Sequence, residues 1–201
     1  MPKINNNKKY MGCSGYSSTG VIDYDNSAIR YENYYFGNSI IGCFSGNGKL
    51  KLMNNQIKAI KNLIKGDILE NGAEVQCLII TKVNKTLPVV ELNNVYYTLK
   101  HPVKYNGKWT NPINIKSPKY VFIDNWYNLV LKNGYSVKIN GIEAITLGHN
   151  QKDKVEYHPY FGTYKVLNAL KKYESFNDGK ISIKNNLKIE RDENGRVCKY
   201  Y

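Results

Sequence analysis

The sequence lacks the features of several common protein classes. No apolar run approaches the about 20 residues that a membrane-spanning helix needs, and no signal-peptide core follows Met1. The four cysteines lie far apart, at Cys13, Cys43, Cys77 and Cys198, with no Cys-x-x-Cys pair. This spacing fits neither a disulfide framework nor a zinc site. We therefore expect reduced thiols, no metal, no membrane contact and a cytoplasmic location.

Acidic residues are scarce as well. The 16 Asp and Glu residues oppose 29 Lys and Arg residues, so the net charge is +13. An excess of this size is found in nucleic-acid-binding proteins. The lysines here are spread singly along a chain rich in Asn, Ile and Tyr, a bias that AT-rich genomes also produce, and no recognition helix stands out. A basic nucleic-acid binder remains an alternative, but nucleic acid is not the expected partner.

Composition divides the chain into three segments. Residues 1–42 form an N-terminal flank rich in Asn, Lys, Gly, Ser and Tyr, whereas residues 43–150 are dense in short apolar or alternating runs. In the C-terminal extension, residues 151–201, helical spacing of apolar residues over 163–173 predicts a short helix. The stretch 180–201 is typical of two strands joined by a turn.

The central segment consists of short runs typical of strands, because apolar residues alternate or cluster over a few positions. The runs are 48–53, 57–60, 75–83, 89–92, 95–99, 126–131, 136–139 and 142–146. Between them lie pairs such as Asn106-Gly107 and Asn140-Gly141, which favour the two-residue turns of β-hairpins. The pattern predicts an all-β fold.

Gly42 and Cys43 are the first candidate site residues. A lone cysteine is most often a small buried apolar residue. A glycine before it leaves the preceding carbonyl unhindered and tolerates a strained backbone. The pair therefore also suits a thiol nucleophile, Cys43, that attacks the Gly42 carbonyl, with Gly42-Cys43 as the scissile bond.

Thr98 and His101 form the second candidate pair, at the end of a predicted strand and before Pro102. Pro102 disfavours a helix at His101, so a turn would bring the two side chains together. The plain interpretation is a turn hydroxyl and a satisfied histidine. The functional interpretation is that Thr98 hydrogen-bonds the scissile amide while His101 contacts its nitrogen and protonates the departing amine.

His149 and Asn150 are the last candidates, and they too could form a simple turn. In the functional interpretation, the Asn150 side-chain amide attacks its own carbonyl to form a succinimide, with His149 polarising that carbonyl. The next residue, Gln151, has no thiol or hydroxyl to accept an acyl group. We therefore expect no protein splicing and little or no cleavage after Asn150.

In this order, these elements resemble the Hint superfamily, which comprises inteins, bacterial intein-like domains and the autoprocessing domain of hedgehog proteins. The resemblance covers residues 43–150 and continues beyond them. The matching stretches are GCFSGNGKLKLMNNQIKAIKNLIKGDIL, YYTLKH, YNLVLKNGYSVKINGIEAITLGHN and, in the extension, VEYHPYFGTYKVLNAL. The last stretch is most similar to the Vint variety, which occurs with von Willebrand A domains.

The resemblance implies a horseshoe-like all-β Hint fold over 43–150, followed by a helix and a hairpin. It implies catalytic roles for Cys43, Thr98, His101, His149 and Asn150. The chain departs from the superfamily in several respects. It has no acidic residue where hedgehog-type domains activate sterol, no room for an endonuclease insertion, and no von Willebrand A domain in its first 42 residues. Vint sequences also more often end this block in Gly-His-Gly.

The function that the resemblance implies is single-turnover cleavage of the chain's own backbone. The Cys43 thiol would move the acyl group of Gly42 from nitrogen to sulfur, and water or a small external nucleophile would resolve the thioester. The substrate is then the chain's own N-terminal segment, and thiol, hydroxyl and imidazole make a cofactor unnecessary. The sequence does not identify a protein partner. A catalytically silent Hint fold that serves as an interaction module is the alternative.

Overall fold

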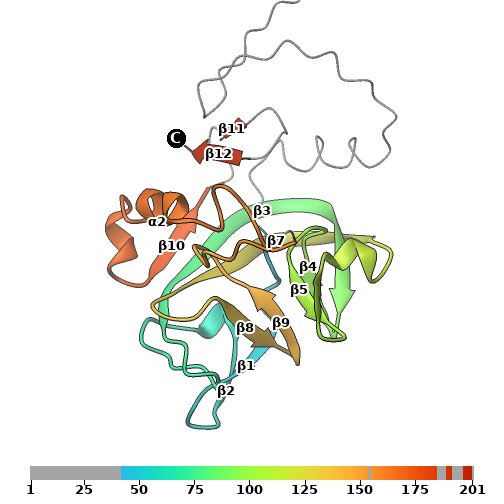
Figure 1. The fold of residues 1–201 in the computed structure, drawn as a ribbon, viewed down its shortest axis with the longest axis horizontal. Coiled ribbons are helices and arrows are strands. Elements are labelled where there is room, and N and C mark those ends of the chain that lie inside the picture. Colours follow the sequence, from blue (N-terminus) through green and yellow to red (C-terminus); the bar gives the residue numbers. More distant parts are fainter. Residues whose placement is uncertain (1–41, 154, 185–188, 192–196, 201) are drawn as a thin grey trace, which may run out of the picture.

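The computed structural model describes residues 42–153, 155–184, 189–191 and 197–200 (Figure 1). The predicted flank up to residue 41 lies outside the described residues. Strands dominate, and the all-β fold is confirmed. The strands are β1 Lys49–Lys51, β2 Ile57–Ala59, β3 Val75–Leu92, β4 Val95–Tyr97, β5 Val103–Tyr105, β6 Lys108–Thr110, β7 Lys119–Leu131, β8 Ser136–Ile139, β9 Ile142–Ile145, β10 Lys180–Ile183, β11 Ile189–Arg191 and β12 Val197–Tyr200.

A long antiparallel ribbon of β3 and β7 runs across the molecule (Figure 1). The sequence predicted two strands, 75–83 and 89–92, in place of β3, and it predicted β7 only from residue 126. All of the predicted residues lie in strands, but the predicted break in β3 and the predicted start of β7 were wrong. The register shifts between Lys82 and Lys85, where Asn84 has a φ of 50°. This bulge contains Asn84, and pairing with β7 continues on both sides of it.

A second sheet, in the order β6-β5-β9-β8, stands beside the ribbon. The strands β5 and β6 were not predicted, because each has only three residues and no long apolar run. The turn between them was expected: Asn106 and Gly107 both have positive φ, at 49° and 77°. Asn140 and Gly141, between β8 and β9, also have positive φ, at 46° and 86°. Positive φ at both positions is typical of the hairpin turns predicted here.

The C-terminal extension is tied to the ribbon by a strand. Helix α2, Tyr164–Leu170, is shorter than the predicted 163–173, and Thr163 caps it by accepting a hydrogen bond from the Lys165 amide. The strand β10 pairs in parallel with β3. The prediction that 180–201 forms only a hairpin was therefore wrong for β10, whereas β11 and β12 do pair as an antiparallel hairpin.

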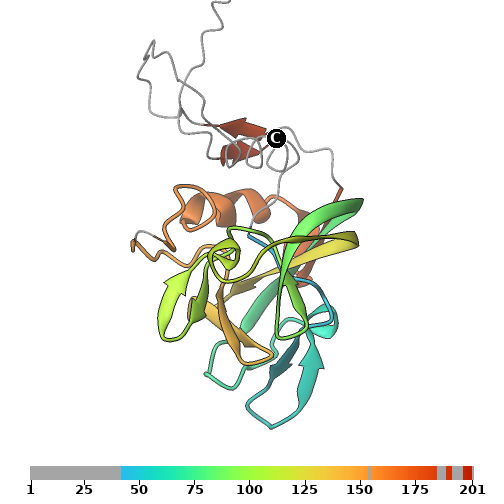
Figure 2. The same ribbon diagram turned by 90° about the vertical axis from the view of Figure 1, so that its right-hand side faces the viewer.

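The ribbon separates two hydrophobic clusters because β3 is buried on both faces. Leu78 and Leu129 belong to the first cluster, with β1, β4, β8 and β9. Ile79 and Val130 belong to the second, with residues of α2 and β10. The two views show α2 and β10 on one side of the ribbon and β1 and β2 at the other end of the molecule (Figure 2). The extension therefore completes the core on one face of β3.

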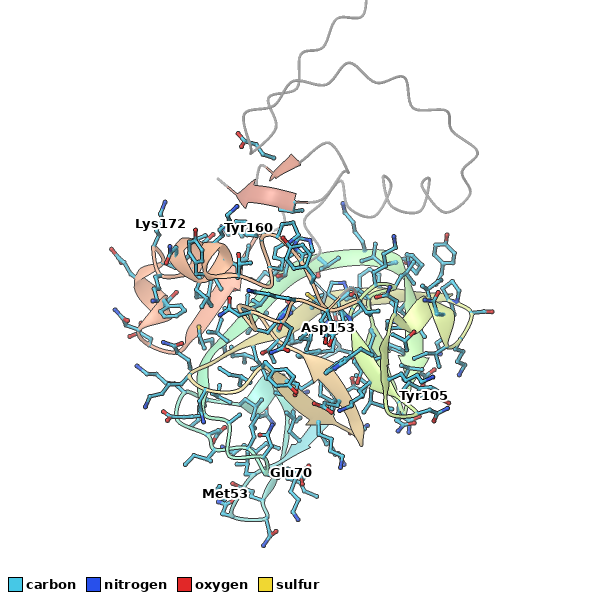
Figure 3. All side chains as sticks on the ribbon, viewed as in Figure 1. Met53, Glu70, Tyr105, Asp153, Tyr160 and Lys172 are labelled. Carbon is cyan, nitrogen blue, oxygen red and sulfur yellow. The ribbon has the colours of Figure 1, made fainter. Side chains whose placement is uncertain are left out.

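The side chains follow the same division (Figure 3). Met53 and Glu70, near β1 and β2, lie at the opposite end of the molecule from Tyr160. Tyr160 is buried in the second cluster. Across the part of the chain that the structure describes, no helix combines the length and the apolar character needed to cross a bilayer.

Candidate active site

Cys43 is held between β4 and β7. Phe44 forms bridges to Tyr97 and to Tyr127, with amide-to-carbonyl hydrogen bonds in both directions between Phe44 and Tyr127, at 3.1 and 3.0 Å. On the other side, the Ser45 amide donates to the Tyr96 carbonyl at 2.8 Å. Backbone pairing on both sides fixes where the Gly42-Cys43 bond lies. It also explains why this short segment is extended.

The Cys43 side chain is almost completely buried, with 2% of its surface exposed. It belongs to the second cluster, whereas Phe44 belongs to the first. The chain therefore crosses between the two clusters at the candidate nucleophile. Burial raises the pKa of the Cys43 thiol above its ordinary value, because a thiolate would lose its hydration there. The resting form is the thiol.

Thr98 lies directly after β4 and contacts the candidate scissile bond. The Cys43 amide, which is the nitrogen side of that bond, donates a hydrogen bond to Thr98 Oγ1 at 3.0 Å. The Thr98 amide donates to the Cys43 carbonyl at 3.0 Å. Thr98 therefore contacts the nitrogen of the Gly42-Cys43 peptide bond.

His101 is fully buried, and its protonation state follows from its contacts. Nε2 lies 2.9 Å from the Ile145 carbonyl oxygen. A carbonyl only accepts, so Nε2 carries the proton and Nδ1 of the neutral ring has a free lone pair. Desolvation lowers the pKa of His101 to about 4, while the backbones of Ile145 and Gly42 act in the opposite direction. The ring is neutral at physiological pH.

The free nitrogen of His101 faces the candidate scissile bond. A methyl group built on Gly42 would lie 2.9 Å from Nδ1. Within the described residues, Nδ1 has no hydrogen-bond partner. The ring packs against Phe44, with centroids 5.3 Å apart, and against Tyr97 at 6.0 Å. These aromatic neighbours keep the imidazole in a dry position beside Gly42.

His149 and Asn150 differ from this arrangement. His149 Nδ1 accepts a hydrogen bond from the Gln151 amide at 2.9 Å, and burial lowers the pKa of His149 to about 4. The predicted contact of His149 was with the Asn150 carbonyl, whereas the ring accepts a hydrogen bond from the nitrogen of the same peptide bond, that of Gln151. Asn150 is exposed and has a φ of 56°.

The extension clamps the segment around His149. The Gly148 amide donates to the Phe161 carbonyl at 2.8 Å, and the Asn150 amide donates to the Gly162 carbonyl at 2.7 Å. Gly162 lies against the His149 ring, since a methyl group there would be 2.8 Å from Nε2. The backbone on one side of Asn150 is therefore fixed by main-chain pairing with the extension.

The structure thus brings Cys43, Thr98 and His101 together around one peptide bond. His149 lies near enough to lower the pKa of His101 slightly. Sequence reasoning missed Asn128, which is 3% exposed and donates a hydrogen bond from Nδ2 to the Gly42 carbonyl oxygen. The signal was an amide side chain inside the apolar run 126–131, since a buried polar group needs a partner. The described residues include no group of three or more His, Cys, Asp or Glu side chains placed to hold a metal ion.

Comparison with known proteins gave one family and several solved structures. A family model described as Vint, a Hint-domain, matches residues 42–199. The Ssp DnaB mini-intein variant M86 is 12% identical over 54% of this chain and 96% of that chain, with a TM-score of 0.41. A DnaB intein from Synechocystis sp. PCC 6803 is 13% identical over 53% and 99%, with a TM-score of 0.39. No curated protein matches the chain.

Proposed function

This chain belongs to the Vint family of Hint domains, and from that membership we propose that it cuts its own backbone between Gly42 and Cys43. The Hint fold supports self-processing in general, and the contacts around this bond support one reaction. The observation that carries the proposal is the neutral, buried His101, whose free Nδ1 faces Gly42 while Thr98 Oγ1 accepts from the Cys43 amide.

The first step is an acyl shift from nitrogen to sulfur. Cys43 Sγ bonds to the Gly42 carbonyl carbon, and the bond from that carbon to the Cys43 nitrogen breaks. The thiol proton passes to His101 Nδ1, which then delivers it to the departing nitrogen. His101 serves first as the base and then as the acid, so the step needs no other proton donor and no cofactor.

The two shifted pKa values oppose an early ion pair. The thiol has a raised pKa and His101 has a lowered one, both because of burial. A resting thiolate and imidazolium are therefore disfavoured, and proton transfer accompanies attack on the carbonyl. Thr98 holds the amide nitrogen in place during the step, because its hydroxyl accepts from the Cys43 amide.

The second step resolves the thioester. Water or a small thiol attacks the same carbonyl carbon, and Cys43 Sγ leaves as a thiol. With water, the products are a segment ending in a Gly42 carboxyl group and a chain beginning with the Cys43 amine. The cut bond is not restored, so each molecule acts once. Gln151 cannot accept the acyl group, and we propose no splicing.

A catalytically silent Hint module is the second candidate, and one observation favours it. Cys43 is 2% exposed and its thiol pKa is raised, so the thiolate, which is the reactive form, is disfavoured in the folded chain. A silent module would keep the Gly42-Cys43 bond under any mild condition. The two candidates therefore differ in a single measurable property.

The test is intact mass spectrometry of the purified chain incubated with and without dithiothreitol. We expect a fragment beginning at Cys43 that forms faster with the thiol. Cys43→Ala should abolish it, whereas Cys77→Ala should not, since Cys77 is also a buried free thiol of the second cluster. We expect no fragment beginning at Gln151. An uncleaved wild-type chain would instead establish the silent module.

A further inference from the structure

We propose that Asn128 is a catalytic residue that donates a hydrogen bond to the oxyanion formed at the Gly42 carbonyl. This inference rests on the proposed cleavage and names the group that stabilises its transition state. When Cys43 Sγ attacks, the carbonyl electron pair moves onto the oxygen, which then carries a negative charge. Asn128 Nδ2 already donates to that oxygen in the uncleaved chain.

The position of Asn128 follows from backbone pairing. Tyr127 exchanges hydrogen bonds with Phe44 in both directions, so the next residue of β7 lies beside the residues that precede Phe44. In an extended chain, the carbonyl of one residue and the amide of the next point to opposite sides. The Gly42 carbonyl points toward β7 and Asn128, while the Cys43 amide points toward Thr98. The scissile bond is thus held by a side chain at each polar end.

The orientation of the Asn128 amide is determined by its other contact. The Leu129 backbone amide donates to Asn128 Oδ1 at 2.7 Å. A backbone N–H can only donate and the Gly42 carbonyl can only accept, so Oδ1 and Nδ2 cannot be exchanged. The amide is locked with its donor toward Gly42. Such a group does not have to reorganise when charge develops.

Electrostatics make this donor suited to a transition state. Asn128 is 3% exposed, and a hydrogen bond to a charged oxygen is stronger than one to a neutral carbonyl, most of all in a dry environment. His101 cannot take this role at the start, because its Nδ1 carries no proton until the thiol has given one up. Asn128 donates at every stage, and its amide does not titrate.

A purely structural role is the competing explanation. Asn128 interrupts an apolar run of β7, and its two hydrogen bonds could serve only to attach residue 42 to the sheet. A structural role predicts that substitutions act through folding and that their effect on cleavage does not depend on pH. An oxyanion donor predicts a different pH dependence for different substitutions.

The experiment compares Asn128→Ala and Asn128→Asp with wild type in thiol-induced cleavage, followed by intact mass at several pH values. We expect Asn128→Ala to slow cleavage by about 10²- to 10³-fold at each pH, the range for the loss of one oxyanion donor. Asn128→Asp should be at least as slow at neutral pH, since a carboxylate repels the oxyanion. Its rate relative to wild type should rise as the pH falls, because a protonated carboxyl group can donate.

The control is Lys58→Met, which removes a part-buried hydrogen bond to Asp67 from β2, a strand that carries none of the residues at this site. It should cleave at the wild-type rate. If wild type cleaves and Asn128→Ala remains within about twofold of it, the inference is overturned while the proposed function stands. If wild type does not cleave, both are overturned. If the Ala variant does not fold, a relative rate for Asn128→Asp that stays flat with pH overturns the inference, and a rising one supports it.

Discussion

The peptide bond between Gly42 and Cys43 and the bond between Asn150 and Gln151 are held in different ways. At the first, side chains contact both polar atoms of the bond: Thr98 at the nitrogen and Asn128 at the oxygen. At the second, one side chain, His149, meets the nitrogen. The backbone on the N-terminal side of that second bond is paired with the extension.

The difference has a chemical consequence. A bond whose oxygen and nitrogen are both held by side chains can change shape at its carbon without breaking main-chain hydrogen bonds. At the second bond, the Asn150 amide would have to leave the Gly162 carbonyl, at 2.7 Å, if the segment moved. Asn150 is also exposed, which leaves its side chain in water and not in a dry site. The comparison favours cleavage at the first bond only.

The largest effect on cleavage at the first bond is expected from substitution of His101. Replacing it by alanine should slow thioester formation by about 10²- to 10⁴-fold, because general acid and base catalysis is lost. Thr98→Ala removes one neutral hydrogen bond of about 0.5 to 1.5 kcal/mol and should cost roughly 2- to 13-fold. Rates of thiol-induced cleavage rank the two. Equal rates in wild type and His101→Ala would remove His101 from the mechanism.

Sequence reasoning selected residues with specific side-chain chemistry and missed Asn128, for which we propose a role that depends on its position. Cys43, Thr98 and His101 carry reactive groups in a recognisable order, and they meet in the structure. Asn128 is an ordinary amide, and its relation to Gly42 appears only when Tyr127 pairs with Phe44. The amide inside the apolar run 126–131 indicates that Asn128 has a buried partner, but a contact across 86 residues leaves no local pattern that identifies Gly42 as that partner.

The fold divides in a similar way. Hairpins with Asn-Gly turns were predictable because a positive φ at Asn140 and Gly141 is a local requirement. The parallel pairing of β10 with β3 was not, since it depends on contacts between distant segments. The continuous β3 was missed for the same reason: Lys82 and Lys85 resemble a loop, and only pairing with β7 makes them part of a strand.

A smaller effect is expected from a matched pair of glycine substitutions, one at each histidine. In Gly42→Ala the new methyl group would lie 2.9 Å from His101 Nδ1, and in Gly162→Ala it would lie 2.8 Å from His149 Nε2. Both crowd a ring by a similar amount. We expect about a tenfold slower cleavage for the first, because its imidazole moves away from the scissile bond. The second should stay within about threefold of wild type.

The readout for this pair is again the rate of appearance of the fragment that begins at Cys43. The melting temperatures of both variants provide the control, since both methyl groups enter crowded positions. If Gly162→Ala slows cleavage as much as Gly42→Ala at equal stability, the two sites are coupled. The distinction between a reactive Gly42-Cys43 bond and an unreactive Asn150-Gln151 bond would then be wrong.

The last prediction concerns the stability of the folded chain in acid. His101 and His149 both have their pKa lowered to about 4 by burial, from an ordinary 6.5. The folded chain therefore holds the neutral rings, while the unfolded chain binds protons below pH 6.5. Stability should fall as the pH decreases from 6.5 to 4, by at most about 1.4 kcal/mol per pH unit for His101. Below both pKa values the loss should level off.

The two histidines can be separated by urea unfolding at pH 7 and pH 4.5. Glutamine cannot titrate, so His101→Gln and His149→Gln should each reduce the difference in unfolding free energy between the two pH values. We expect similar reductions for the two variants, because burial lowers the pKa of each histidine from 6.5 to about 4. A reduction seen for only one variant would mean that the other histidine keeps an ordinary pKa in the folded chain.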